Sequence, residues 1–170
     1  EILNYLPEDR LLFNEEMKNH TTFKIGGPVD LMVLPQNEEE IHSIISFCRQ
    51  RDIPLFIFGA GSNLLVRDRG IRGIAMKLGE NLDEVEVNGE EIQAQAGVKL
   101  STLAQIAAFY SLSGLEFAEG IPGSLGGALV MNAGAFDGEM KEIVTQARAI
   151  GPDGSFKTFQ NEEIQFGYRQ

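Results

Sequence analysis

The chain has 170 residues, of which 43% are hydrophobic and 23% charged, a balance typical of one folded domain or two small ones. Its formal net charge is −11, from 25 acidic and 14 basic residues, which argues against a nucleic-acid surface because such surfaces are normally basic. No apolar run reaches the roughly 18 residues of a membrane span, and residues 1–10 lack the features of a signal peptide. With a single cysteine, Cys48, these features favour a reducing, cytoplasmic location and argue against nucleic acid or membrane as partners. They do not exclude an anionic small ligand, and they carry no signal for an oligomeric state.

The first half of the chain is expected to form a small α/β subdomain over residues 1–78. Residues 7–17 predict a short amphipathic helix, and residues 29–35 predict a strand that ends at its proline. Asn37 followed by three glutamates predicts a capped helix, with a core-facing stripe at helical spacing. That stripe comprises Ile41, Ile44, Ile45 and Cys48. Residues 54–58 predict a buried strand, so the order is strand, helix, strand.

The second half, residues 79–170, is expected to form an α+β subdomain. Residues 74–78, at the end of the first half, and residues 85–89 and 91–97 predict short strands, and Asn88-Gly89 predicts a hairpin between the last two. Residues 100–112 predict a helix with Ser101 as its cap. Its inward positions are Leu100, Leu103, Ala104, Ala107 and Ala108. Residues 144–159 predict two strands joined by Pro-Asp-Gly.

A first glycine segment, residues 59–63, joins two hydrophobic runs. Gly59 and Gly61 permit backbone angles closed to other residues, so that successive N–H groups can converge on an anion, and Ser62 and Asn63 add donors. A tight turn between strands explains the same pattern. A Rossmann site does not, because the third glycine and the following helix are missing.

A second glycine segment lies at residues 120–134. Pro122 stiffens the turn, and the glycines after it lead into a helix whose start offers unpaired N–H groups to a negative ligand. Glycines also cluster at purely structural bends. Two such segments, one in each half, predict one long ligand between them, such as a pyrophosphate with an aromatic group at each end.

Four motifs then occur in order along the whole chain: NHTTFKIGG at 19–27, GAGSNLLV at 59–66, GIPGSLGGALVMNAGAF at 120–136 and FGYR at 166–169. Together they resemble the UDP-N-acetylenolpyruvoylglucosamine reductases, flavoproteins of peptidoglycan precursor synthesis. The resemblance implies an α+β protein with the FAD-binding fold of the vanillyl-alcohol oxidase (PCMH) type. Its two α+β subdomains, residues 1–78 and 79–170, would clasp a non-covalently bound FAD.

The resemblance also implies site residues. The FAD pyrophosphate would be held by Gly59, Ala60, Gly61, Ser62 and Asn63, with Thr21 and Thr22 supporting them. The other side of the cofactor would be lined by Gly120, Pro122, Gly123, Ser124, Gly127 and Ala128, with Gly134 and Ala135 near the flavin ring. Tyr168 and Arg169 would lie at the substrate. The Arg169 guanidinium would stabilise carboxylate charge that grows in the transition state, although Tyr-Arg alone reads as ordinary surface.

The implied reaction is the NADPH-dependent reduction of UDP-N-acetylglucosamine enolpyruvate to UDP-N-acetylmuramate. The family continues past the Tyr-Arg pair into a region that supplies a Ser or Cys proton donor and a Glu, so this chain corresponds to the FAD-binding part and is expected to be inactive alone. Two alternatives stay open: another FAD-dependent oxidoreductase of this fold, and a non-catalytic flavin-binding module. His20, His42 and Cys48 form no recognisable metal set, so no metal is expected.

Overall fold

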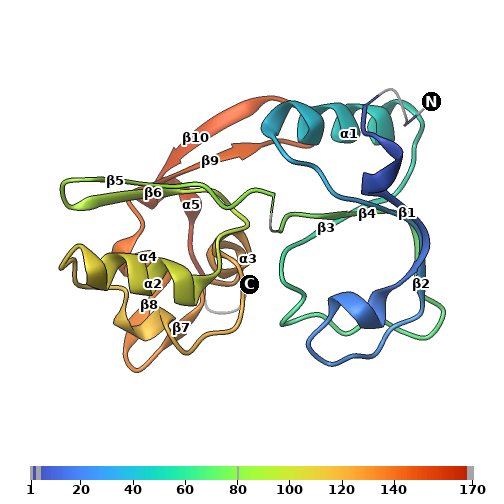
Figure 1. The fold of residues 1–170 in the computed structure, drawn as a ribbon. Coiled ribbons are helices and arrows are strands. Elements are labelled where there is room, and N and C mark those ends of the chain that lie inside the picture. Colours follow the sequence, from blue (N-terminus) through green and yellow to red (C-terminus); the bar gives the residue numbers. More distant parts are fainter. Residues whose placement is uncertain (1, 3–4, 80, 168–170) are drawn as a thin grey trace.

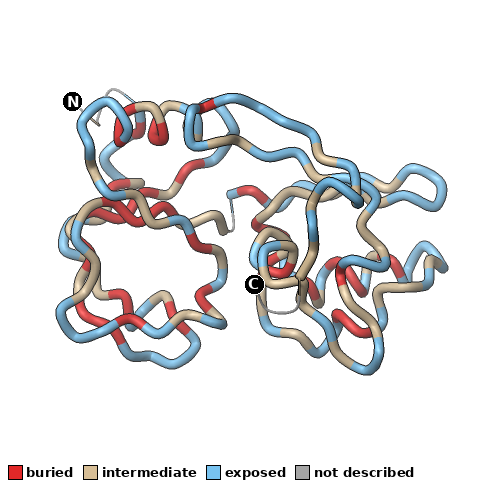
Figure 2. The backbone as a smooth tube through the Cα atoms, turned by 180° about the vertical axis from the view of Figure 1, so that it is seen from behind, coloured by how far each residue is buried: buried red, intermediate tan, exposed pale blue. Residues whose placement is uncertain are grey.

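The computed structural model describes residue 2, residues 5–79 and residues 81–167. In Figure 1, a sheet with one covering helix occupies one half of the molecule, and short hairpins and helices occupy the other. Figure 2 shows buried residues gathered in each half. Within the described residues, no helix combines the length and the apolar character needed to cross a membrane.

The sheet of the first half has four strands in the order β1-β2-β4-β3. The strands are β1 (Leu11–Glu16), β2 (Pro28–Val33), β3 (Leu55–Phe58) and β4 (Ile71–Lys77). β1 runs antiparallel to β2, whereas β2 and β3 run parallel to β4. Alternate residues of the central strands bury on opposite faces: Val33 and Met76 pack in the core under α1 (Glu38–Gln50), and Met32 and Ala75 pack in the core on the other face.

Two expectations for the first half are wrong. Residues 7–17 are not one helix: a short 3-10 helix, η2 (Glu8–Arg10), leads into β1, because Leu11 pairs with Val33 of β2 and buries its side chain. β3 is not a buried strand but the edge of the sheet, and its Ile57 is 46% exposed. The strand at residues 29–35 is confirmed as β2.

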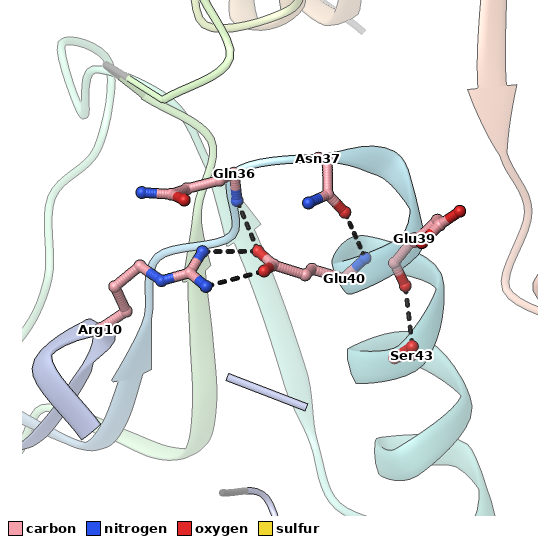
Figure 3. Close-up of polar contacts among 6 residues, drawn as sticks. All are labelled: Arg10, Gln36, Asn37, Glu39, Glu40 and Ser43. Carbon is pink, nitrogen blue, oxygen red and sulfur yellow. Dashed lines mark hydrogen bonds and ion pairs between the residues drawn. The ribbon is translucent and has the colours of Figure 1, made fainter. Parts of the chain in front are cut away.

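The helix predicted after Asn37 is confirmed as α1. The Asn37 Oδ1 atom accepts a hydrogen bond from the Glu40 N–H at 2.9 Å, which caps the helix (Figure 3). Ile44, Ile45 and Cys48 are buried as expected, and Ile41 packs against the same core. Glu40 also anchors the helix to η2, since the Arg10 guanidinium donates two hydrogen bonds to its carboxylate at 2.6 and 2.7 Å.

We expect Glu40→Gln to lower the free energy of unfolding by about 2 kcal/mol near neutral pH, because it removes the charge from this pair. The hydrogen bonds from Arg10, and also from the Gln36 N–H, hold the pKa of the Glu40 carboxyl below its ordinary value of 4.5, so the pair contributes stability above that value and loses it as the pH falls. Urea unfolding at several acidic pH values should therefore show a flatter profile in the variant.

Glu39→Gln is the matched control, because it removes the same charge one position earlier from an exposed side chain. Equal losses of stability in the two variants would show that helix charge, rather than the Arg10 contact, is responsible.

The second half is built from short elements. Its strands are β5 (Val85–Asn88), β6 (Glu91–Ala94), β7 (Gly134–Ala135), β8 (Gly138–Glu139), β9 (Gln146–Ile150) and β10 (Phe156–Gln160). Its helices are α2 (Leu100–Phe109), η4 (Glu116–Ala118), α3 (Leu125–Met131), α4 (Met140–Ile143) and α5 (Asn161–Ile164), and η3 (Met17–His20) completes the first half. A core of its own forms between α2, η4, α3 and α4.

The predicted hairpins β5–β6 and β9–β10 and the helix α2 are confirmed. In α2 the buried residues are Leu100, Leu103, Ala104 and Ala107, as predicted. Ala108, however, is exposed, and Lys99 rather than Ser101 occupies the N-cap position. The helix begins at Leu100 because residues 96–100 pair with residues 123–126, and the chain enters the helix directly from that pairing.

The β9–β10 hairpin reaches back over α1 (Figure 1). Arg148 forms an ion pair with Glu38 at 2.7 Å, and the Phe156 ring stacks on His42 with centroids 6.2 Å apart. Arg49 of α1 donates to the Asp153 carbonyl in the hairpin loop at 3.3 Å. The late hairpin therefore packs on the first half, and the division at residues 78 and 79 stays a prediction.

Candidate functional site

The structure brings the two glycine segments into direct contact. Residues 59–63 follow the end of β3, and residues 120–124 lead into α3. A Cβ atom placed on Gly59 would overlap the Ser124 hydroxyl, and one placed on Gly123 would lie 3.3 Å from the Ser62 Oγ atom. Parts of the chain some sixty residues apart thus share one place, as the two-segment hypothesis requires.

The first segment lies on the residues that follow η3. The Thr22 N–H donates to the Gly61 carbonyl at 3.2 Å, and Thr21 is buried, with its hydroxyl donating to the Ile25 carbonyl at 3.2 Å. Gly61 has a φ of +67°, and a Cβ atom there would overlap the His20 carbonyl oxygen. Glycine is needed at 61 for both reasons, the backbone angle and the close approach.

The second segment is held by residues 96–100. The Leu100 N–H donates to the Gly123 carbonyl at 3.1 Å, the Leu125 N–H to the Val98 carbonyl at 2.8 Å and the Gly126 N–H to the Ala96 carbonyl at 2.9 Å. The prediction that the start of α3 is open is therefore wrong for two N–H groups. Those of Leu125 and Gly126 are used in hydrogen bonds to residues 96–98.

Other N–H groups of the two segments have no acceptor within the part of the chain that the structure describes. They belong to residues 59–63 in the first segment, and to Gly120, Gly123, Ser124 and Gly127 in the second. Unpaired N–H groups in a glycine turn are donors for an anion such as a diphosphate. The arrangement can thus bind negative charge with backbone dipoles, in a protein whose net charge is −11.

The remaining predicted residues fall into three groups. Ala128 is buried in the core of the second half, and its N–H is used on the Ser124 carbonyl. Gly134 and Ala135 form the β7–β8 hairpin beside η4, so their approach to a flavin ring stays a prediction. Tyr168 and Arg169 lie outside the described residues.

A polar group next to the first segment has no signal in the sequence. The His20 ring contacts the Glu15 carboxylate through Nε2 at 2.9 Å and the Lys77 ammonium through Nδ1 at 3.4 Å. Lys77 lies 57 positions from His20 along the chain, which is why no sequence motif joins them. Among the residues described here, no three His, Cys, Asp or Glu side chains gather as a metal site would need.

A two-part α+β fold with unpaired backbone N–H groups where two glycine segments meet fits an FAD-binding domain. The model of one such family, described as FAD binding domain, matches residues 29–160. The chain belongs to this family.

Curated relatives are similar to nearly the whole chain. UDP-N-acetylenolpyruvoylglucosamine reductase of Syntrophomonas wolfei is 60% identical over 99% of the chain and 56% of its own length. The protein of the same name from Alkaliphilus oremlandii is 47% identical over 96% of the chain and 54% of its own length. The chain thus spans about half the length of the relatives it matches.

Solved structures support the predicted fold class. The crystal structure of UDP-N-acetylenolpyruvylglucosamine reductase from Thermus caldophilus has a TM-score of 0.77 and 34% identity, over 94% of this chain and 55% of that one. Cholesterol oxidase from Brevibacterium sterolicum has a TM-score of 0.70 at 17% identity, over 91% of this chain and 34% of that one, and shows the fold alone. The FAD-binding fold of the vanillyl-alcohol oxidase type is confirmed.

FAD is the cofactor of this family, and the site fits it. Two observations support the fit. N–H groups in both glycine segments have no acceptor among the described residues, and the glycines have no side chains that would keep a ligand away from these N–H groups. No heavy atom of the described residues lies within 4 Å of a Cβ position on Gly120, so this part of the chain leaves that space open.

Proposed function

We propose that the complete protein is a UDP-N-acetylenolpyruvoylglucosamine reductase, which uses NADPH and FAD to reduce UDP-N-acetylglucosamine enolpyruvate to UDP-N-acetylmuramate. The observation that carries the proposal is the contact between two glycine segments with unpaired N–H groups. It occurs in a chain of the FAD-binding family that is 60% identical to a reductase of this name. The proposal includes a cytoplasmic location.

The residues proposed to hold FAD come from both halves of the chain. The diphosphate would lie on residues 59–63. The other side of the cofactor would be lined by Gly120, Pro122, Gly123, Ser124, Gly127 and Ala128, with Gly134 and Ala135 nearer the flavin ring. When bound, FAD supplies the hydride chemistry, and the protein supplies binding and orientation. Attachment is proposed to be non-covalent, with residues 1–78 and 79–170 as the two clasping subdomains.

Backbone donors suit a diphosphate in this particular protein. An excess of acidic side chains makes the long-range field unfavourable to an anion, so the binding energy has to come from groups in direct contact. N–H groups in a turn are fixed by the backbone and lose little freedom when a ligand binds. At the substrate end, Arg169 is proposed to stabilise the developing carboxylate charge and Tyr168 to bind substrate.

The test uses the full-length protein and its visible spectrum. We expect the purified protein to show flavin absorbance that NADPH bleaches and UDP-N-acetylglucosamine enolpyruvate restores under anaerobic conditions. Bleaching without restoration would point to another flavin oxidoreductase of this fold. A colourless protein that takes up no added FAD would refute the proposal altogether.

A further inference from the structure

We infer that His20 is a positioning residue for the FAD site: its neutral ring links Glu15 to Lys77 and keeps the first glycine segment in its binding shape. Protonation of the ring would break this link and weaken FAD binding. The inference rests on the proposed FAD site and adds a residue and a pH response to it.

The link ties three elements of the first half together. Glu15 lies on β1, His20 ends η3, and Lys77 is the last residue of β4, where it pairs with Phe58 directly before the first glycine segment. The side chains of His20 and Glu15 are only 15% and 27% exposed, so solvent reaches the contact poorly. Each side of the imidazole thus meets a charged group from a different strand.

The partners determine which ring nitrogen carries the proton. An ammonium has only donors, so Lys77 at 3.4 Å requires Nδ1 to accept. The proton therefore sits on Nε2, which donates to the Glu15 carboxylate at 2.9 Å. Asn19 donates to the same carboxylate oxygen at 3.3 Å, and the hydrogen bond from His20 is the main cause that holds the pKa of Glu15 below its ordinary value.

The backbone of His20 carries this arrangement to the glycine segment. Its carbonyl oxygen occupies the place where a Cβ atom of Gly61 would lie, and the Thr22 N–H two residues later binds the Gly61 carbonyl at 3.2 Å. A shift at the end of η3 therefore displaces the segment whose N–H groups would bind the diphosphate.

A second proton on the ring changes the contact with Lys77 from attraction to repulsion. The Nδ1 atom of His20 then carries an N–H that faces the N–H groups of the Lys77 ammonium, and the two positively charged groups repel each other. The carboxylate of Glu15 lies on the far side of the ring and carries only one compensating charge. The neighbouring Glu16 and Lys18 pair with each other at 3.6 Å on exposed side chains and leave this imbalance in place.

The experiment measures the dissociation constant of FAD for the full-length protein, by flavin fluorescence, at about pH 8 and about pH 5.5. We expect binding by the wild type to be about tenfold weaker at the lower pH. His20→Gln, whose amide both accepts and donates but does not titrate, should match the wild type at the higher pH and lose the pH response. Lys77→Met should also lose it, because the protonated ring then meets no ammonium.

His42→Gln is the matched control: His42 lies on α1 against Phe156, so its replacement changes the FAD affinity only through the hairpin contact and should leave the ratio of the two dissociation constants at the wild-type value. A wild type that binds FAD equally at both pH values, or more tightly at the lower one, would refute the inference while leaving the proposed function in place. The inference would also be refuted if a folded His20→Gln protein kept the full pH response or failed to bind FAD at the higher pH. No FAD binding by the wild type at either pH would refute the proposed function, and the inference with it.

Discussion

Gly61→Ala is expected to abolish FAD binding and to lower the free energy of unfolding by about 2–4 kcal/mol. The backbone at Gly61 has a φ of +67°, and the added methyl group would overlap the His20 carbonyl oxygen, which is backbone and cannot rotate away. The segment has to move, and its N–H groups would leave the positions proposed for FAD binding. Denaturant unfolding and FAD titration of the full-length protein measure the two effects.

Gly89→Ala is the matched control for this substitution. Gly89 has nearly the same φ, +64°, in the β5–β6 turn, but no heavy atom lies within 4 Å of its Cβ position. The control should therefore cost only the backbone strain, about 1 kcal/mol, and leave FAD binding unchanged. If the two variants behaved alike, the close approach of Gly61 to His20 would be irrelevant to the site.

Gly127→Ala is expected to change stability and FAD binding in opposite directions. Among the described residues, its Cβ atom would meet only the Ser124 Oγ atom, at an ordinary contact distance of 3.5 Å. Alanine also favours a helix over glycine by about 1 kcal/mol. The free energy of unfolding should rise slightly. FAD affinity should fall by about tenfold or more, because the methyl group would occupy the approach to an N–H group proposed to face the cofactor.

Gly126→Ala provides the contrast from the neighbouring position. There the added Cβ would lie 2.9 Å from the Ala96 Cβ atom, so this variant should lose stability through packing within the protein. If Gly127→Ala bound FAD as tightly as the wild type, the cofactor would not approach the start of α3, and the assignment of this residue would fail.

Elements with short-range signals could be predicted from the sequence. Three such signals act within a few residues, and the element that each predicts is confirmed. They are Asn37 and the acids after it for the start of α1, Pro35 for the end of β2, and Asn88-Gly89 for the β5–β6 hairpin. Residues 7–17 have the local pattern of a helix, but most of them form β1, because the strand is stabilised by pairing with β2. The edge position of β3 likewise depends on strand order, which no local pattern contains.

The candidate site divides in the same way. Both glycine segments stand out in the sequence, since their composition is unusual over a few positions. Ala96 and Val98 pair with the start of α3 through a long-range contact, which uses two N–H groups that the local pattern predicts to be free. The link from Glu15 through His20 to Lys77 has no pattern in the sequence, because it joins β1 and η3 to β4, which lies far from them along the chain.

The β9–β10 hairpin has a consequence for how the two halves move. The halves meet at the glycine segments and again, at a separate place, where the hairpin lies along α1 (Figure 1). Two joints resist a hinge motion that one joint would permit, so the spacing between the halves is set before any ligand arrives. Loosening the contacts of Arg148 or Phe156 would therefore weaken ligand binding from a distance. The two halves would move more freely relative to each other, and binding would have to overcome the entropy lost when they are brought together.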